Sequence, residues 1–389
     1  LLTTQAVTQL WIARFDGDFA ALARLQGLCS TLGSLVAFVV GPVLGSLTDA
    51  VGRKPVLYIP PLFDLLQRLV VLPFMTVGSE VLARTALGGV GAPLMGVFDA
   101  ALGDLHVSRP MVLGTWQSRM SLAQTAAMVA TPIISSTLAA RDLRLPLVVS
   151  AGILATNLLV TKFCLVETLD RAKRKPVVWL SSSPFSFFRL FRSGPRLRSL
   201  CCLVLLDNLI QPVLGGHNGI LQIYQADSLG WGLLHRGRYE SVSAVLQLPG
   251  FVVALALMRK VGLPWTARIG IVSTCVGLLT SFFARRQWQF YAAVLCGSLG
   301  KGSGLSASPA FSAMVAAEGA CVGFGQGELN AMVGNLRGSV GLFSGLLWGG
   351  IFSLGSRRGT PGLFFLVGLC LAVAQLGISS RGLMRVSGY

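Results

Sequence analysis

The residues best suited to bind a solute or carry a charge interrupt long apolar stretches of this sequence. Asp207, Gln211 and Asn218 are spaced i, i+4 and i+11, which places them on one face of a helix. Ionisable groups inside a membrane are costly and usually face a cavity or a partner. This face therefore predicts a binding site for a solute or a proton. Interhelical hydrogen bonding, worth about 0.6 kcal/mol per bond, is the structural alternative.

Two cationic residues lie in similar apolar stretches. Lys301 stands among small residues at helical spacing, namely Gly297, Gly304 and Ser308. It could pair with Asp207, meet an anionic solute, or face an aqueous vestibule at the end of its helix. Arg84 is either a structural charge within a bundle or part of the cavity. With the three residues above, these two complete the candidates for solute binding or proton coupling.

The sequence shows no residue set typical of soluble catalysis or of a metal centre. It contains no G-x-x-x-x-G-K-[ST] loop for nucleotide phosphates. The three histidines lie far apart, and the eight cysteines follow no metal-ligand spacing. We therefore expect no enzyme activity, no cofactor and no metal.

The composition indicates that these residues lie in a membrane. Of 389 residues, 53% are apolar and 12% are charged, and the mean hydropathy is +0.69. A soluble domain carries about 25% charged residues. The net charge of +17 comes from basic residues between apolar runs, which is a topology signal rather than a nucleic-acid footprint. We expect a multi-pass integral membrane protein that binds no nucleic acid, in a membrane that the sequence leaves open.

Eleven stretches are long and apolar enough to form membrane-spanning helices, which need about 20 residues. They lie at roughly 25–46, 56–77, 80–101, 112–138, 144–166, 199–222, 240–258, 267–284, 288–314, 329–354 and 360–380. Residues 1–13 are interpreted as the outer end of an incomplete first span, so the complete spans are numbered 2 to 12. The bias of basic residues predicts that the loop after span 2 is cytoplasmic. This topology places Arg236 and Arg238 in an outer loop.

A basic linker divides the spans into two sets. Residues 167–198 carry eight Lys and Arg residues, three Pro and three consecutive Ser. The expected organisation is a first bundle at 1–166 (partial span 1, spans 2–6), this linker, and a second bundle at 199–389 (spans 7–12). A long loop between two six-span halves is typical of a duplicated transporter, and its charge also suits contact with anionic lipid.

The loop after span 2 carries the most specific motif. Residues 45–55 read G-S-L-T-D-A-V-G-R-K-P, which resembles the G-x-L-x-D-R-x-G-R-K signature of the major facilitator superfamily. The matching positions are Gly45, Leu47, Asp49, Gly52, Arg53 and Lys54, whereas Ala50 stands where the signature has Arg. The two glycines are expected to allow close helix approach and a tight turn.

Other segments share this resemblance. Glu167-Thr168-Leu169 looks like the E-T-L that closes span 6 in the family. The start, residues 1–4, is similar to the end of span 1 in the tetracycline/proton antiporter-like branch, which includes the hippocampus abundant transcript-like proteins. Span 5 departs from the antiporter pattern, because Pro132 is present without the flanking glycines. The sequence therefore does not predict an antiport mechanism.

The resemblance implies an all-α fold of two six-helix bundles, with spans 1, 4, 7 and 10 around a central cavity. It implies a monomeric secondary active transporter that moves a small solute across the lipid bilayer by alternating access. Proton coupling through Asp207, and closure of the cytoplasmic side by Asp49, Arg53 and Lys54, are further expectations. A receptor or scaffold without transport activity stays open as the alternative, because span 1 is incomplete, position 50 lacks the Arg of the signature, and span 5 lacks its glycines.

Overall fold

Long apolar segments fold as helices because lipid offers the backbone no hydrogen-bond partner. The computed structural model describes residues 3–91, 110–169, 174, 183–214, 219–301, 314–315, 318–319, 321–323 and 326–382, which contain helices and no strand. Within this part of the chain, six helices are long and apolar enough to cross a membrane. The all-α class expected from the sequence is confirmed.

The first half consists of helices that follow the predicted spans closely. They are α1 (Thr4–Arg14), α2 (Phe19–Val51), α3 (Arg53–Leu57), α4 (Ile59–Phe74), α5 (Val77–Leu82), the π-helical turn η1 (Ala83–Leu87), α6 (Gly88–Gly91), α8 (Pro110–Arg141) and α9 (Leu145–Cys164). Asp18 caps α2 by accepting a hydrogen bond from the backbone N–H of Ala21, at 2.9 Å.

The second half begins within the predicted linker. Its elements are the 3₁₀ turn η3 (Pro184–Phe187), α10 (Phe188–Arg192), α11 (Pro195–Leu214), α12 (Gly219–Leu229), α13 (Leu233–Val261), α14 (Leu263–Phe283), α15 (Gln287–Cys296), α16 (Ser298–Lys301), α18 (Gln326–Arg357) and α19 (Leu363–Gly382). Span 7 is predicted to end at residue 222, whereas α12 extends to Leu229. Span 8, predicted from residue 240, already begins at Leu233.

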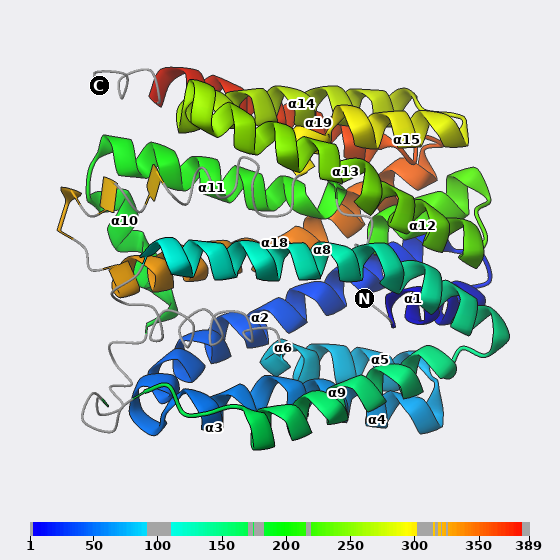
Figure 1. Ribbon diagram of the computed structural model, residues 1–389. Coiled ribbons are helices and arrows are strands. Elements are labelled where there is room, and N and C mark those ends of the chain that lie inside the picture. The colour runs from blue at the N-terminus through cyan, green and yellow to red at the C-terminus, as the bar shows by residue number, and fades with distance from the viewer. Residues whose placement is uncertain are drawn as a thin grey trace.

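The helices run roughly along one common direction, so their connections gather at two ends (Figure 1). One end carries the loop at residue 52 and the short helices α3 and α10, and we call it the motif end. The other end carries the turns at residues 15–18, 142–144, 230–232 and 284–286, and we call it the opposite end. Helices of the first half fill the lower part of Figure 1, and most of the second half lies above them.

The two halves meet most extensively through two helix pairs, α2 with α18 and α8 with α13, and further contacts join α1 to α12 and α13, and α2 to α12 and η3. Glycines make the first contact close. Gly349 leaves room for only a hydrogen, because a Cβ there would lie 2.5 Å from the carbonyl oxygen of Ala23. A Cβ at Gly345 would overlap the Gly27 carbonyl oxygen. These small residues let the two backbones touch, and we call this contact the glycine seam.

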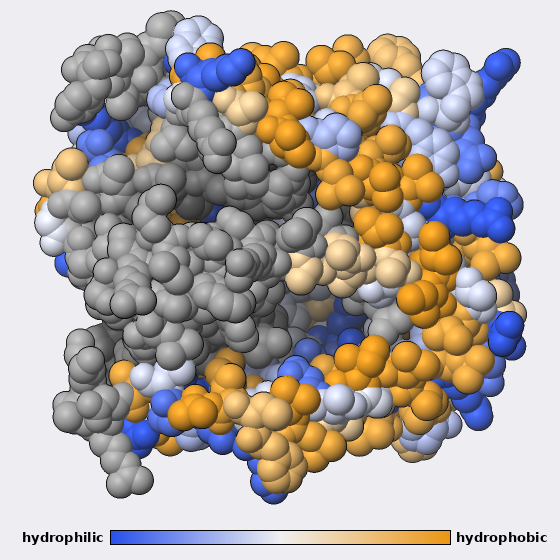
Figure 2. Space-filling model, viewed as in Figure 1, coloured by the Kyte–Doolittle hydropathy of each residue, from blue (hydrophilic) through white to orange (hydrophobic). Residues whose placement is uncertain are grey.

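One apolar core continues across both halves near the opposite end. It joins Trp11 of α1 and Leu22 of α2 to Tyr224 of α12 and to Trp348 and Phe352 of α18. On the visible face of the molecule, apolar residues cover much of the described surface, and many of the hydrophilic ones lie toward the two ends (Figure 2). This distribution is the one expected of a helical bundle embedded in a bilayer.

Candidate functional site

The motif end holds a cluster built on the loop between α2 and α3. The guanidinium of Arg53 is buried and donates a hydrogen bond from Nη1 to Thr48 Oγ1 at 2.5 Å. The carboxylate of Glu167, at the end of the first half, accepts hydrogen bonds from the backbone N–H groups of Arg53 (2.9 Å) and Lys54 (3.3 Å). The Lys54 ammonium donates to the carbonyl oxygen of Lys162 at 2.9 Å. These contacts tie the loop to the end of α9, within the first half.

Glu167 belongs to this cluster through its hydrogen bonds to the loop, although the sequence analysis assigned it no role. Burial raises the pKa of its carboxyl group, but hydrogen bonds from the backbone N–H groups of Leu169, Arg53 and Lys54, together with the charge of Arg174, outweigh burial and bring the pKa below its ordinary value. The carboxylate is therefore ionised at neutral pH. Its only signal in the sequence was the E-T-L tripeptide at residues 167–169.

The signature residues lie in this cluster with different roles. Leu47 packs on the apolar side chains of Leu44 and Leu57. Gly45 does not provide the close helix approach that was expected, because no described atom lies within 4 Å of a Cβ placed there. Its carbonyl oxygen instead accepts a hydrogen bond from the Thr48 hydroxyl at 2.6 Å. Asp49 lies in α2, and its side chain is outside the described part of the structure, so its gate role stays a prediction.

Gly52 is the glycine that the cluster requires. Its φ of +120° is a conformation that L side chains rarely adopt. A Cβ there would also overlap the carboxylate of Glu167. We expect Gly52→Ala to lower the free energy of unfolding by about 1–3 kcal/mol, measured by thermal or denaturant unfolding in detergent. Gly78→Ala is the control, because a Cβ there meets nothing within 4 Å, and equal losses in the two variants would contradict this geometry.

Arg84 lies in a charged group inside the first half. It belongs to η1, and its charge interacts with Glu80 of α5, which is 2% exposed. Arg68 of α4 interacts with both Glu80 and Asp64. A π-helical turn often marks a functional position, but the neighbours of Arg84 among the described residues favour the structural role over the cavity role.

Asp207 lies on α11 and is buried, at 6% exposure. Its charge interacts with Arg337 of α18, so one charged partner of Asp207 comes from within the second half. Gln211 lies one turn further along α11. Asn218 and the side chain of Lys301 are outside the described residues, and the pairing of Lys301 with Asp207 stays a prediction.

A second polar cluster lies between the halves, and we call it the inter-half polar cluster. Its members come from four helices: Gln5 and Gln9 of α1, Gln26 of α2, Gln222 and Gln225 of α12, and Arg236 and Glu240 of α13. Arg236 donates a hydrogen bond from Nη2 to Gln9 Oε1 at 2.5 Å. Gln222 donates from Nε2 to Glu240 Oε1 at 2.6 Å. The first bond joins the two halves directly.

The cluster is almost closed to solvent. Gln5, Gln222 and Gln225 are each 0% exposed, and Arg236 is 1% exposed. The placement of Arg236 in an outer loop was therefore wrong. The burial of Arg236 was not predicted because hydropathy ends an apolar span where charged residues begin. The i, i+4 spacing of Arg236 and Glu240, which places both on one helical face, was the available signal.

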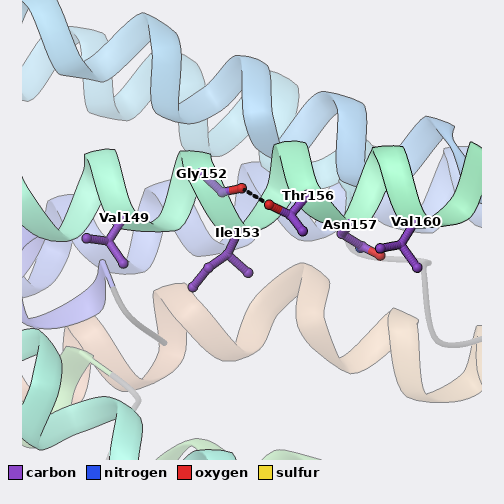
Figure 3. Close-up of a pocket in the computed structure, with 6 residues that line it drawn as sticks. All are labelled: Val149, Gly152, Ile153, Thr156, Asn157 and Val160. Carbon is purple, nitrogen blue, oxygen red and sulfur yellow. Dashed lines mark hydrogen bonds between the residues drawn. The ribbon is translucent and has the colours of Figure 1, made fainter.

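A surface groove lies apart from these clusters. It is lined by one face of α9, with Val149, Ile153 and Val160 beside Asn157 and Thr156 (Figure 3). The Thr156 hydroxyl donates to the Gly152 carbonyl oxygen at 2.9 Å. All these side chains belong to one helix that is largely exposed on the outside of the bundle, so the groove is a lipid-facing surface rather than a solute site.

The sequence pattern that defines the Major Facilitator Superfamily matches residues 7–342. The chain belongs to this superfamily. It is thus a multi-pass membrane transporter rather than an enzyme, as the loop signature implied.

Curated relatives in this superfamily agree with the branch suggested by the sequence. The chain is 26% identical to the tetracycline resistance protein, class C, of Escherichia coli over 93% of this chain and 88% of the relative. It is also 26% identical to the human hippocampus abundant transcript-like protein 1 over 87% of this chain. The chain spans 65% of the length of that human protein.

Solved structures of the superfamily share the fold over nearly the whole chain. The human organic anion transporter MFSD10 aligns with a TM-score of 0.70 at 16% identity, covering 97% of this chain and 96% of that protein. A D-xylose-proton symporter aligns with a TM-score of 0.71 at 15% identity, covering 97% and 91%. At these identities the likeness concerns the fold alone.

Proposed function

We propose that this protein is a secondary active transporter that moves a small solute across a membrane by alternating access. The observation that carries the proposal is the inter-half polar cluster, in which the hydrogen bond between Gln9 and Arg236 joins the two halves. A buried polar contact between two rigid bodies can exchange its partners for water or a solute when the bodies rock apart.

The position of the contacts between the halves supports this motion. The glycine seam and the inter-half polar cluster both lie toward the opposite end, and the shared apolar core lies there too. At the motif end, the loop after α2 is bonded to the end of α9 in its own half, and Phe38 of α2 contacts Phe185 of η3 across the halves, with 5.6 Å between the ring centroids. The opposite end holds the more extensive contacts between the halves, and rocking of one half on the other would open it.

Distances between spin labels test alternating access without a known solute. One pair, at Arg141 and Arg285, spans the halves at the opposite end, and a second pair, at Val51 and Lys260, spans them at the motif end; all four residues are exposed. Labels would replace these residues in a cysteine-free background. We expect two distance populations at each end, which shift in opposite directions when pH or solute is changed.

A pair within the first half, at Gly78 and Arg141, provides the control and should keep a single distance. If the distances at both ends stay fixed at pH 5.5 and 7.5 and with panels of sugars, amino acids, organic anions and cations, the protein does not alternate. That result would favour the receptor or scaffold interpretation.

Asp207 is the carboxylate that we propose for proton coupling, and its interaction with Arg337 makes this testable. Asp207→Asn leaves a half-buried guanidinium without its counter-charge, and we expect it to cost on the order of 2 kcal/mol of unfolding free energy. The double variant Asp207→Asn/Arg337→Gln should regain most of that loss. If Asp207 couples protons, both variants lose the pH dependence of the label distances; a double variant that regains stability and keeps the pH dependence assigns Asp207 a structural role only.

A further inference from the structure

Several buried polar atoms in the inter-half polar cluster lack a hydrogen-bond partner among the described residues. They include Nε and Nη1 of Arg236, Oε1 of Gln222, and both amide atoms of Gln225. Buried polar groups are nearly always satisfied in proteins, and each exception calls for a physical reason. Leaving such groups unpaired costs about 1–3 kcal/mol each, and more for a charged group. Several of them in one place indicate a site that is completed by another molecule.

The backbone of α12 is shaped to admit polar side chains at this place. Gly219 and Gln222 are spaced i, i+3 and share a face of α12. A Cβ at Gly219 would overlap the amide of Gln26 from α2, so the glycine makes room for the Gln26 amide in the cluster. Figure 1 shows α12 and α1 close together at this end, with α13 above them.

The charges of the cluster select the chemistry of the molecule that fits it. Arg236 donates from Nη2 to Gln9, and its Nε and Nη1, which carry three N–H donors on a planar, permanently charged group, have no described partner. Charged N–H donors of this kind bind carboxylate oxygens. The carboxylate of Glu240 already accepts from Gln222 and lies close enough to interact with Arg236, so a single added negative charge is balanced better than a double one.

We propose that the inter-half polar cluster is the solute site of this transporter and that it binds a carboxylate group, with Arg236 as the charged donor and Gln225 as a hydrogen-bonding partner. This assignment rests on the transport function proposed above. The carboxylate belongs either to a simple organic acid or to a zwitterion whose cationic group lies beside Glu240. Rocking that separates α1 from α13 breaks the bond between Gln9 and Arg236 and exposes the site.

Three compounds of matched size probe this chemistry: 3-phenylpropionate, phenylalanine and 3-phenylpropionamide. Binding to the purified full chain would be measured by isothermal titration calorimetry and by the shift in melting temperature. We expect at least one of the two carboxylates to bind, and the amide to bind at least tenfold more weakly or not at all. Binding by phenylalanine alone identifies the zwitterion, and binding by 3-phenylpropionate identifies the organic acid. Equal binding of the amide, or no binding of any of the three, would overturn the proposal.

Variants locate the site. Arg236→Gln should weaken carboxylate binding at least tenfold, and Arg236→Lys should weaken it less, because the charge is retained although the planar guanidinium donors are lost. Arg238→Gln is the matched control on the same helix, because Arg238 is exposed, and it should bind within twofold of the parent. If Arg236→Gln fails to fold, Arg236→Gln/Glu240→Gln removes both charges together. Unchanged binding in these variants would exclude the site.

Gln225→Leu separates a binding role from a structural one. Because neither amide atom has a described partner, replacing the amide by an apolar group of similar size should leave the melting temperature of the ligand-free protein equal or higher. The same change should weaken carboxylate binding several-fold. A lower melting temperature with unchanged binding would show that Gln225 only supports the fold. Binding is measured at equilibrium and does not depend on transport. If the carboxylate binds while the spin-label distances stay fixed, the binding site is retained and the transport function is refuted.

Discussion

Gly349→Ala should destabilise the closed opposite end, whereas Gly350→Ala, one residue further along the same helix, should not. A Cβ at Gly349 would lie 2.5 Å from the carbonyl oxygen of Ala23, a backbone atom that cannot turn away. A Cβ at Gly350 meets nothing within 4 Å. We expect Gly349→Ala to cost about 1–3 kcal/mol through overpacking, and Gly350→Ala to be neutral or stabilising by up to about 1 kcal/mol.

The same pair of variants reports on the conformational equilibrium. Since α2 and α18 belong to different halves, the added methyl group at residue 349 separates the two halves at the opposite end rather than loosening the packing within one half. The spin-label distance between Arg141 and Arg285 should therefore shift toward the longer population in Gly349→Ala and stay unchanged in Gly350→Ala. Identical melting temperatures and distances in the two variants would mean that the helices do not meet at the glycine seam.

Glu167→Ala should release the loop between α2 and α3. The variant removes the oxygens that accept hydrogen bonds from the backbone of Arg53, Lys54 and Leu169. Each bond to a charged group is worth about 1.5–3 kcal/mol when shielded from water. Because Glu167 is only half-buried, solvent offsets part of this, and we expect a total loss of roughly 2 kcal/mol. Glu167→Gln keeps an acceptor oxygen and should lose about half as much.

Thr168→Val is the control for this position, because the Thr168 hydroxyl has no described hydrogen-bond partner. It should match the parent protein in unfolding. The pH dependence gives an independent check. The pKa of Glu167 is lower in the folded protein, so its stabilisation is complete above the ordinary carboxyl value and is lost as pH falls through the lowered one. The stability gap between parent and Glu167→Ala should therefore be constant from pH 7 to 5 and shrink only at lower pH; a gap that shrinks between pH 7 and 6 would contradict this.

Composition and local pattern determined the class of this protein, because both depend on residues that are neighbours in the chain. Apolar stretches long enough to cross a bilayer must form helices wherever they pack. The loop signature at residues 45–54 contains the glycine, Gly52, at which the chain turns. The span at 144–166, for example, corresponds to α9 at Leu145–Cys164. Local pattern could also place Asp207 and Gln211 on one helical face.

Only the tertiary structure decided which polar residues meet. Gln9 and Arg236 are 227 positions apart, and Arg53 and Glu167 are 114 apart, so neither contact leaves a local trace in the sequence. A charged residue at the start of a span is equally compatible with a water-exposed loop and with a buried site. Burial of Arg236 follows from the packing of α1 and α12 against α13, which brings amide partners to a charge that hydropathy alone assigns to water.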